Sequence, residues 1–186
     1  MVATPEAYFL TFTGYATWLH GDERGSVDRF HSGVDSPRLE PDKSRELYER
    51  EFAAKSAPAL FDAGMRDILD REMRDVCRVR QWPLYALNVR TNHVHAVVAA
   101  HANVDEMLTA LKANGTRALR ENGLVGARER VWTRHGSTQW LWNEADIEAA
   151  CAYVIDAQGA PLTAGAWKEW RDRFREGHPR QPRRDP

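Results

Sequence analysis

The sequence predicts an α+β domain, a ferredoxin-like (RRM-like) antiparallel sheet with helices mainly on one face. Segments of strand and helix character follow one another as strand, helix, strand, strand, helix, strand, helix along 186 residues. Two of the strand segments are joined by only two residues, which favours an antiparallel hairpin. The composition is 42% hydrophobic and 28% charged, as in ordinary globular domains. This order of elements suits helices packed on an antiparallel sheet.

The first 82 residues predict one strand, a long loop and two helices. Residues 7–18 are rich in β-branched and aromatic side chains, which is typical of a strand. Residues 19–42 combine Gly, Pro, Ser and charge without a period and predict a loop. A short helix is expected over 43–55. Residues 58–82 place apolar side chains at helical intervals and predict an amphipathic helix.

The hairpin comes next. Residues 83–90 and 93–100 read as strands, and Thr91 and Asn92 join them. Asparagine tolerates the left-handed backbone conformation of tight turns, so it suits this position.

The rest of the domain predicts two more helices around a short strand region. Helix 103–122 should stop before Gly123, and one or two short strands are expected within 130–142. A last helix is expected over 143–158, with Asn143 as its N-cap.

Residues 1–160 are therefore interpreted as one domain and residues 161–186 as a C-terminal extension. The end of that extension is rich in Pro and Arg, which predicts disorder. No apolar run is long enough for a membrane span, and no signal peptide is recognisable. The two cysteines, Cys77 and Cys151, lie far apart and predict neither a disulfide nor a zinc site. These features favour a cytoplasmic protein.

Two histidines share one face of the strand predicted over 93–100. His93 and His95 flank a single valine in "TNHVHAVVAA", so their side chains point the same way, ~7 Å apart along the strand. Such a pair can ligate a metal ion. It can equally be two solvated or structurally hydrogen-bonded histidines. The pair alone leaves both interpretations open.

Tyr153 lies in the middle of the last predicted helix. A single helical tyrosine is usually a core residue. Here, however, Asp156 and Gln158 follow within about one and a half turns, an unusually polar setting.

The two motifs together resemble the single-tyrosine transposases of the HUH (His-hydrophobic-His) class, which include short insertion-sequence transposases and REP-associated relatives. "NHVHAVV" is similar to the metal motif of that family, and "YVIDAQG" is similar to its nucleophile helix. "YFLTFTGYATWLHGDERGSVDR" and "VWTRHGSTQWLW" also resemble a bacterial subgroup. The resemblance extends over about residues 7–159.

The resemblance implies a metal-dependent transposase that nicks and rejoins single-stranded DNA, or a domesticated relative that kept this chemistry. His93 and His95 match the metal ligands, with Mg²⁺ or Mn²⁺ as the implied ion, and Tyr153 matches the nucleophile. The implied intermediate is a 5′-phosphotyrosine. No nucleotide cofactor is expected, because the sequence contains no GxxxxGK[ST] loop.

The third metal ligand has two candidates. Gln158 is the best match to the polar ligand of the family. Members often carry that ligand four residues after the tyrosine, where this chain has Ala157. Positions four and five residues on differ from the tyrosine by about 40° and about 140° around a helix. Asp156, three residues on, is therefore the competing candidate.

Basic and aromatic side chains alternate within residues 108–142, a composition that suits single-stranded nucleic acid through phosphate contacts and base stacking. The alternative is a solvated helix face beside core tryptophans. The expected DNA-binding residues are Lys112, Arg117, Arg120, Arg130, Arg134, Trp132 and Trp140.

The expected partner is single-stranded DNA that carries a hairpin, and the expected location is cytoplasmic and nucleoid-associated. Both a monomer and a homodimer are compatible with the resemblance. The main alternative is a catalytically silent module on the same fold that binds single-stranded nucleic acid. A hydrolytic metalloenzyme ranks third, because the sequence offers no activating Glu on a helix.

Overall fold

The computed structural model describes residues 4–17, 42–44, 47–48, 57–99 and 102–156. Its centre is a four-stranded antiparallel sheet in the order β2-β3-β1-β4. This is the strand order of the βαββαβ ferredoxin-like arrangement, so the predicted fold class is confirmed. The strands are β1 (Ala7–Thr13), β2 (Leu84–Val89), β3 (His93–Ala99) and β4 (Ser137–Leu141).

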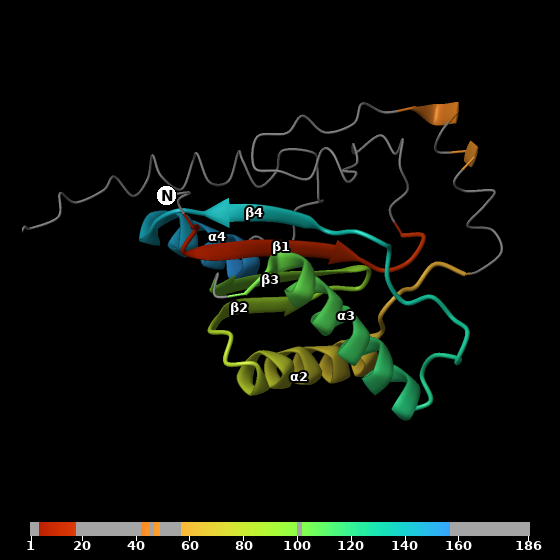
Figure 1. Ribbon diagram of the computed structural model, residues 1–186. Helices are drawn as coiled ribbons and strands as arrows, with labels where there is room; N and C mark the ends of the chain where they lie inside the picture. The colour runs from red at the N-terminus through yellow and green to blue at the C-terminus, as the bar shows by residue number, and fades with distance from the viewer. Residues whose placement is uncertain (1–3, 18–41, 45–46, 49–56, 100–101, 157–186) are drawn as a thin grey trace, which may run out of the picture.

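The helices lie on both faces of the sheet (Figure 1). The helices α2 (Ala63–Val79) and α3 (Val104–Glu121) cover one face, as expected. The third helix, α4 (Glu144–Asp156), packs on the opposite face. The alternation of strand side chains thus feeds two separate cores.

The larger core lies between the sheet and the helices α2 and α3. Leu10 and Phe12 from β1 are buried there with Leu69 of α2. Gly115 of α3 allows a close approach of the two helices, because a Cβ atom at this position would lie 2.9 Å from Leu69 Cδ2. The apolar face predicted from residues 58–82 is present in α2. The helix begins later than predicted, at Ala63, and Asp62 caps it by accepting a hydrogen bond from the Met65 N–H.

Several expected boundaries shift. The strand expected within 130–142 is confined to β4, and Trp132 contributes only an isolated bridge to Gly14. Residues 43, 44, 47 and 48 are helical, in agreement with the short helix expected there, and its remaining residues lie outside the described part. Most of the predicted loop 19–42 and the whole extension 161–186 also lie outside it.

The hairpin is present, but its turn differs from expectation. The Arg90 N–H donates to the His93 carbonyl at 2.7 Å and closes the turn. Asn92 does not have the positive φ that we expected. Its carbonyl instead accepts from the Gly14 N–H, and its side chain contacts His93. No helix in the described part of the chain is long and apolar enough to cross a membrane.

Candidate active site

The sheet face beneath α4 has an apolar half and a polar half. The apolar half consists of Ala7, Phe9, Ala86, Val97 and Leu141, which pack against buried residues of α4. The polar half includes a row that crosses all four strands. Direct cross-strand partners share a face, and the register pairs Asn88 with His95, His95 with Thr11, and Thr11 with Ser137.

His93 and His95 lie on this polar half, both buried. Their ring centroids are 4.7 Å apart and the ring planes meet at 71°. The prediction that the two imidazoles share one face is therefore confirmed. This separation is shorter than the ~7 Å between alternate residues of a strand, so the two rings lean toward each other.

Each imidazole is held through its Nδ1 atom. His93 Nδ1 lies 2.7 Å from the side-chain oxygen Oδ1 of Asn92, the residue before it. His95 Nδ1 lies 2.8 Å from the hydroxyl oxygen of Thr11, on the neighbouring strand β1. The Nε2 atoms are therefore the nitrogens left to face a ligand.

Both imidazoles favour the neutral form. Burial is the main cause that lowers the pKa of His93 to about 4, and the positive charge of Arg90 lowers it further. Burial, then His93 and then Arg90, hold the pKa of His95 well below its ordinary value. A neutral imidazole keeps the lone pair that a metal ion requires.

Tyr153 of α4 lies against the histidine pair. Its ring centroid is 5.6 Å from that of His95, with the planes at 72°, and 5.7 Å from that of Phe9. Tyr153 is buried, so it is a core residue as well as a neighbour of the site. Packing of α4 on the sheet thus brings together the two motifs that lie far apart in the sequence.

The third predicted ligand is less well defined. Asp156 is exposed at the end of α4, and Gln158 lies outside the described residues. Among the residues that the structure describes, no three His, Cys, Asp or Glu side chains form a group that could hold a metal ion. The two histidines fit two of the ligands of a divalent ion such as Mn²⁺, because they are neutral, adjacent and fixed by hydrogen bonds.

The predicted DNA-binding lysine has structural partners. Lys112 Nζ donates to the carbonyl oxygens of Thr133 and His135, both at 2.9 Å. Burial lowers the pKa of its ammonium group to about 8. Lys112 therefore fastens the segment before β4 to α3.

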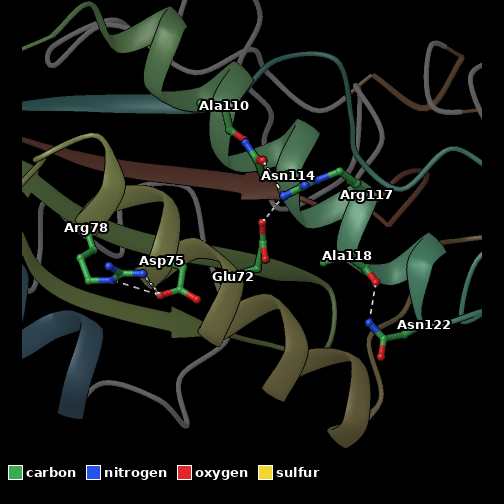
Figure 2. Close-up of polar contacts among 8 residues, drawn as sticks. All are labelled: Glu72, Asp75, Arg78, Ala110, Asn114, Arg117, Ala118 and Asn122. Atoms are coloured by element: carbon green, nitrogen blue, oxygen red, sulfur yellow. Dashed lines mark hydrogen bonds and ion pairs between the residues drawn. The ribbon is translucent and has the colours of Figure 1, made fainter.

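Three of the predicted arginines also have partners within the protein. Figure 2 shows Arg117 of α3 reaching Glu72 of α2, with Nη2 and Oε1 2.8 Å apart. Arg120 Nη2 donates to the Glu129 carbonyl at 3.3 Å, and the guanidinium of Arg130 lies 5.4 Å from the ring centroid of Tyr15. All three side chains remain exposed, so a phosphate contact would compete with these interactions.

The two predicted tryptophans differ in environment. Trp132 packs against Phe12 and Phe61, and its indole N–H donates to the Lys112 carbonyl at 3.0 Å. Trp140 on β4 is 44% exposed and lies edge-on to Trp142 at 5.5 Å. Trp140 is thus the more exposed of the two, because Trp132 is partly buried. Arg134 is also exposed.

Comparison with known proteins identifies the family of this chain. The sequence model of a family described as "Transposase IS200 like" matches residues 47–154, more than half of the chain. The chain belongs to the IS200-like transposase family. The matched region contains both histidines and the tyrosine, so the resemblance on which the sequence prediction relied is confirmed at the level of the family.

Two solved structures are similar to this family member. One is a REP-associated tyrosine transposase bound to a REP hairpin, with 12% identity and a TM-score of 0.43. The match covers 82% of this chain and 66% of that chain, just under two thirds of its length. The other, from Deinococcus radiodurans, carries a provisional assignment as a transposase. It is 18% identical, with a TM-score of 0.40, and the match covers 86% of this chain and 95% of that chain. No curated protein matches.

Proposed function

We propose that this chain is a metal-dependent transposase that nicks and rejoins single-stranded DNA, with Tyr153 as its nucleophile. The observation that carries the proposal is the contact between Tyr153 and His95, whose ring centroids are 5.6 Å apart, with His93 adjacent on the same sheet face. Membership of a transposase family supports the same reaction.

The proposed chemistry balances without a cofactor that stores energy. The Tyr153 hydroxyl oxygen attacks phosphorus in a DNA backbone, and the bond from phosphorus to the 3′ oxygen breaks. The tyrosine loses a proton and the departing 3′ oxygen gains one. DNA is then linked through its 5′ phosphate to the tyrosine. In the second step a 3′-hydroxyl attacks that phosphorus, and the tyrosine leaves with its hydroxyl restored.

His93 and His95 would hold a divalent ion, Mg²⁺ or Mn²⁺, together with an oxygen ligand from Gln158 or Asp156. When bound, such an ion neutralises charge on the phosphate oxygens and orients the phosphate for in-line attack. The protein provides a buried, neutral pair of imidazoles beside the nucleophile.

The proposed substrate is single-stranded DNA with a hairpin. Among the predicted contacts, exposed Arg134 and Trp140 are the most direct candidates for a phosphate contact and a base stack, respectively. Arg117, Arg120 and Arg130 would join them only by exchanging their present partners. The proposed activity is compatible with both a monomer and a homodimer. The proposed location is the cytoplasm, in association with the nucleoid.

A strand-cleavage assay on labelled, hairpin-bearing single-stranded DNA, with Mn²⁺ and with excess chelator, tests the proposal. The expected result is metal-dependent cleavage with DNA retained on the protein after denaturation. Binding without cleavage would favour the silent binding module. Cleavage that leaves a free 5′ phosphate and no protein-linked DNA would favour a metallohydrolase.

A further inference from the structure

Two side chains to which the proposed mechanism gives no role contact the histidine pair. Thr11 lies on β1, directly across the strand pairing from His95, and its hydroxyl oxygen is 2.8 Å from His95 Nδ1. Asn92 lies in the hairpin turn, and its Oδ1 is 2.7 Å from His93 Nδ1. One histidine is thus held from the neighbouring strand and the other from the turn that precedes β3.

The Asn92 contact fixes the tautomer of His93. An amide oxygen only accepts hydrogen bonds, so Nδ1 of a neutral His93 must carry the proton and donate it. The lone pair of His93 then resides on Nε2. A hydrogen bond of this kind also restricts rotation of the ring.

The Thr11 contact allows either tautomer of His95, because a hydroxyl both donates and accepts. Only the tautomer with the proton on Nδ1, donated to the Thr11 oxygen, leaves the lone pair of His95 on Nε2. The rings of Phe9 and His93, at 5.3 Å and 4.7 Å from that of His95, pack against this imidazole and restrict it further.

We infer that Thr11 and Asn92 are positioning residues, which hold His95 and His93 by Nδ1 so that both imidazoles present Nε2 to one divalent ion. This inference rests on the proposed function, since it concerns the metal site assumed there. Partners of this kind contribute about 10- to 100-fold to metal affinity in other proteins. We expect an effect of that size for removal of either contact.

A purely structural role would predict a different outcome. If the contacts only satisfied buried polar atoms, their loss would lower stability and leave the affinity of the folded protein for metal unchanged. Thr11→Val removes the hydroxyl at nearly constant shape, and Thr11→Ser restores it. Thr13→Val is the matched control. Thr13 lies two residues along the same strand and face, directly across the pairing from His93, but its hydroxyl contacts Thr133 at 2.9 Å.

Asn92 supplies an independent second test. The backbone carbonyl of Asn92 accepts hydrogen bonds from the Gly14 N–H and the Thr17 hydroxyl. Asn92→Ala retains both of these hydrogen bonds. Asn92→Asp keeps an acceptor oxygen at the same place. A folding defect in Thr11→Val would therefore leave the inference testable at Asn92.

The experiment measures Mn²⁺ affinity of the full chain by electron paramagnetic resonance titration, and the tautomers of both histidines in metal-free protein by two-bond ¹H–¹⁵N correlation spectra. Thr11→Val and Asn92→Ala should each bind Mn²⁺ about 10- to 100-fold more weakly. Thr11→Val should lose the Nδ1–H tautomer of His95, and Asn92→Ala that of His93. Thr11→Ser, Asn92→Asp and Thr13→Val should keep the tautomers and most of the affinity.

Two negative outcomes are distinguishable. Normal Mn²⁺ binding by the unaltered protein, with equal binding by Thr11→Val and Asn92→Ala, would overturn the positioning role and leave the proposed function intact. No Mn²⁺ binding by the unaltered protein would overturn the metal site itself and this inference with it.

Discussion

Acid should destabilise the metal-free protein, and His93 should account for a measurable share of the effect. The pKa of His93 is lowered from 6.5 to about 4, chiefly by burial. In the unfolded chain the imidazole regains its ordinary pKa. Between pH 6.5 and about 4 the unfolded state therefore binds the extra proton, and stability falls as the pH falls. Each pKa unit corresponds to about 1.4 kcal/mol, so the loss through His93 is about 3 kcal/mol.

Urea unfolding in chelator, at steps from pH 7.5 to pH 4, measures this loss. His93→Gln should lose about 3 kcal/mol less than the unaltered protein over this range. It should still lose some stability through His95, whose pKa is lowered in the same direction. Identical pH profiles for His93→Gln and the unaltered protein would refute the reasoning.

Four further substitutions separate structural from DNA-contacting residues. Lys112→Met should lower the free energy of unfolding by about 1–3 kcal/mol, because two carbonyl oxygens lose their donor, and urea unfolding measures it. Arg134→Ala should change stability by less than about 0.5 kcal/mol and, in salt titrations of single-stranded DNA binding, reduce the log–log slope by about 0.7. Trp140→Ala should weaken single-strand binding by about 1–3 kcal/mol in the folded protein, measured by fluorescence anisotropy. Trp132→Ala should instead destabilise the fold by about 3 kcal/mol or more. A stable Trp132→Ala with weakened DNA binding would reverse these two assignments.

The part of the site that depends on strand periodicity could be predicted from the sequence. Alternation along one strand is sufficient to place His93 and His95 on the same face, and the short link predicts the hairpin that carries them. The position of Tyr153 next to His95 depends on which face α4 covers. Periodicity does not contain that information, so the prediction relied on the resemblance.

Side-chain partners could not be predicted from composition. Lys112 and Arg117 look like free cations in the sequence, yet one caps two carbonyl groups and the other pairs with Glu72 across two helices. The sequence alone assigns neither Thr11 nor Asn92 a role at the histidine pair. Strand register decides that Thr11 faces His95, and register is fixed by the whole sheet.

The proposed function depends most directly on Tyr153 forming the covalent bond to DNA. The direct measurement incubates the protein with labelled, hairpin-bearing single-stranded DNA and Mn²⁺, isolates any denaturation-resistant adduct, and maps the modified peptide by mass spectrometry. We expect one adduct on Tyr153, which should be lost in Tyr153→Phe while DNA binding is retained. The adduct should persist in Tyr85→Phe, a control at an exposed tyrosine of β2. An adduct on another residue, or undiminished adduct in Tyr153→Phe, would contradict the proposed function.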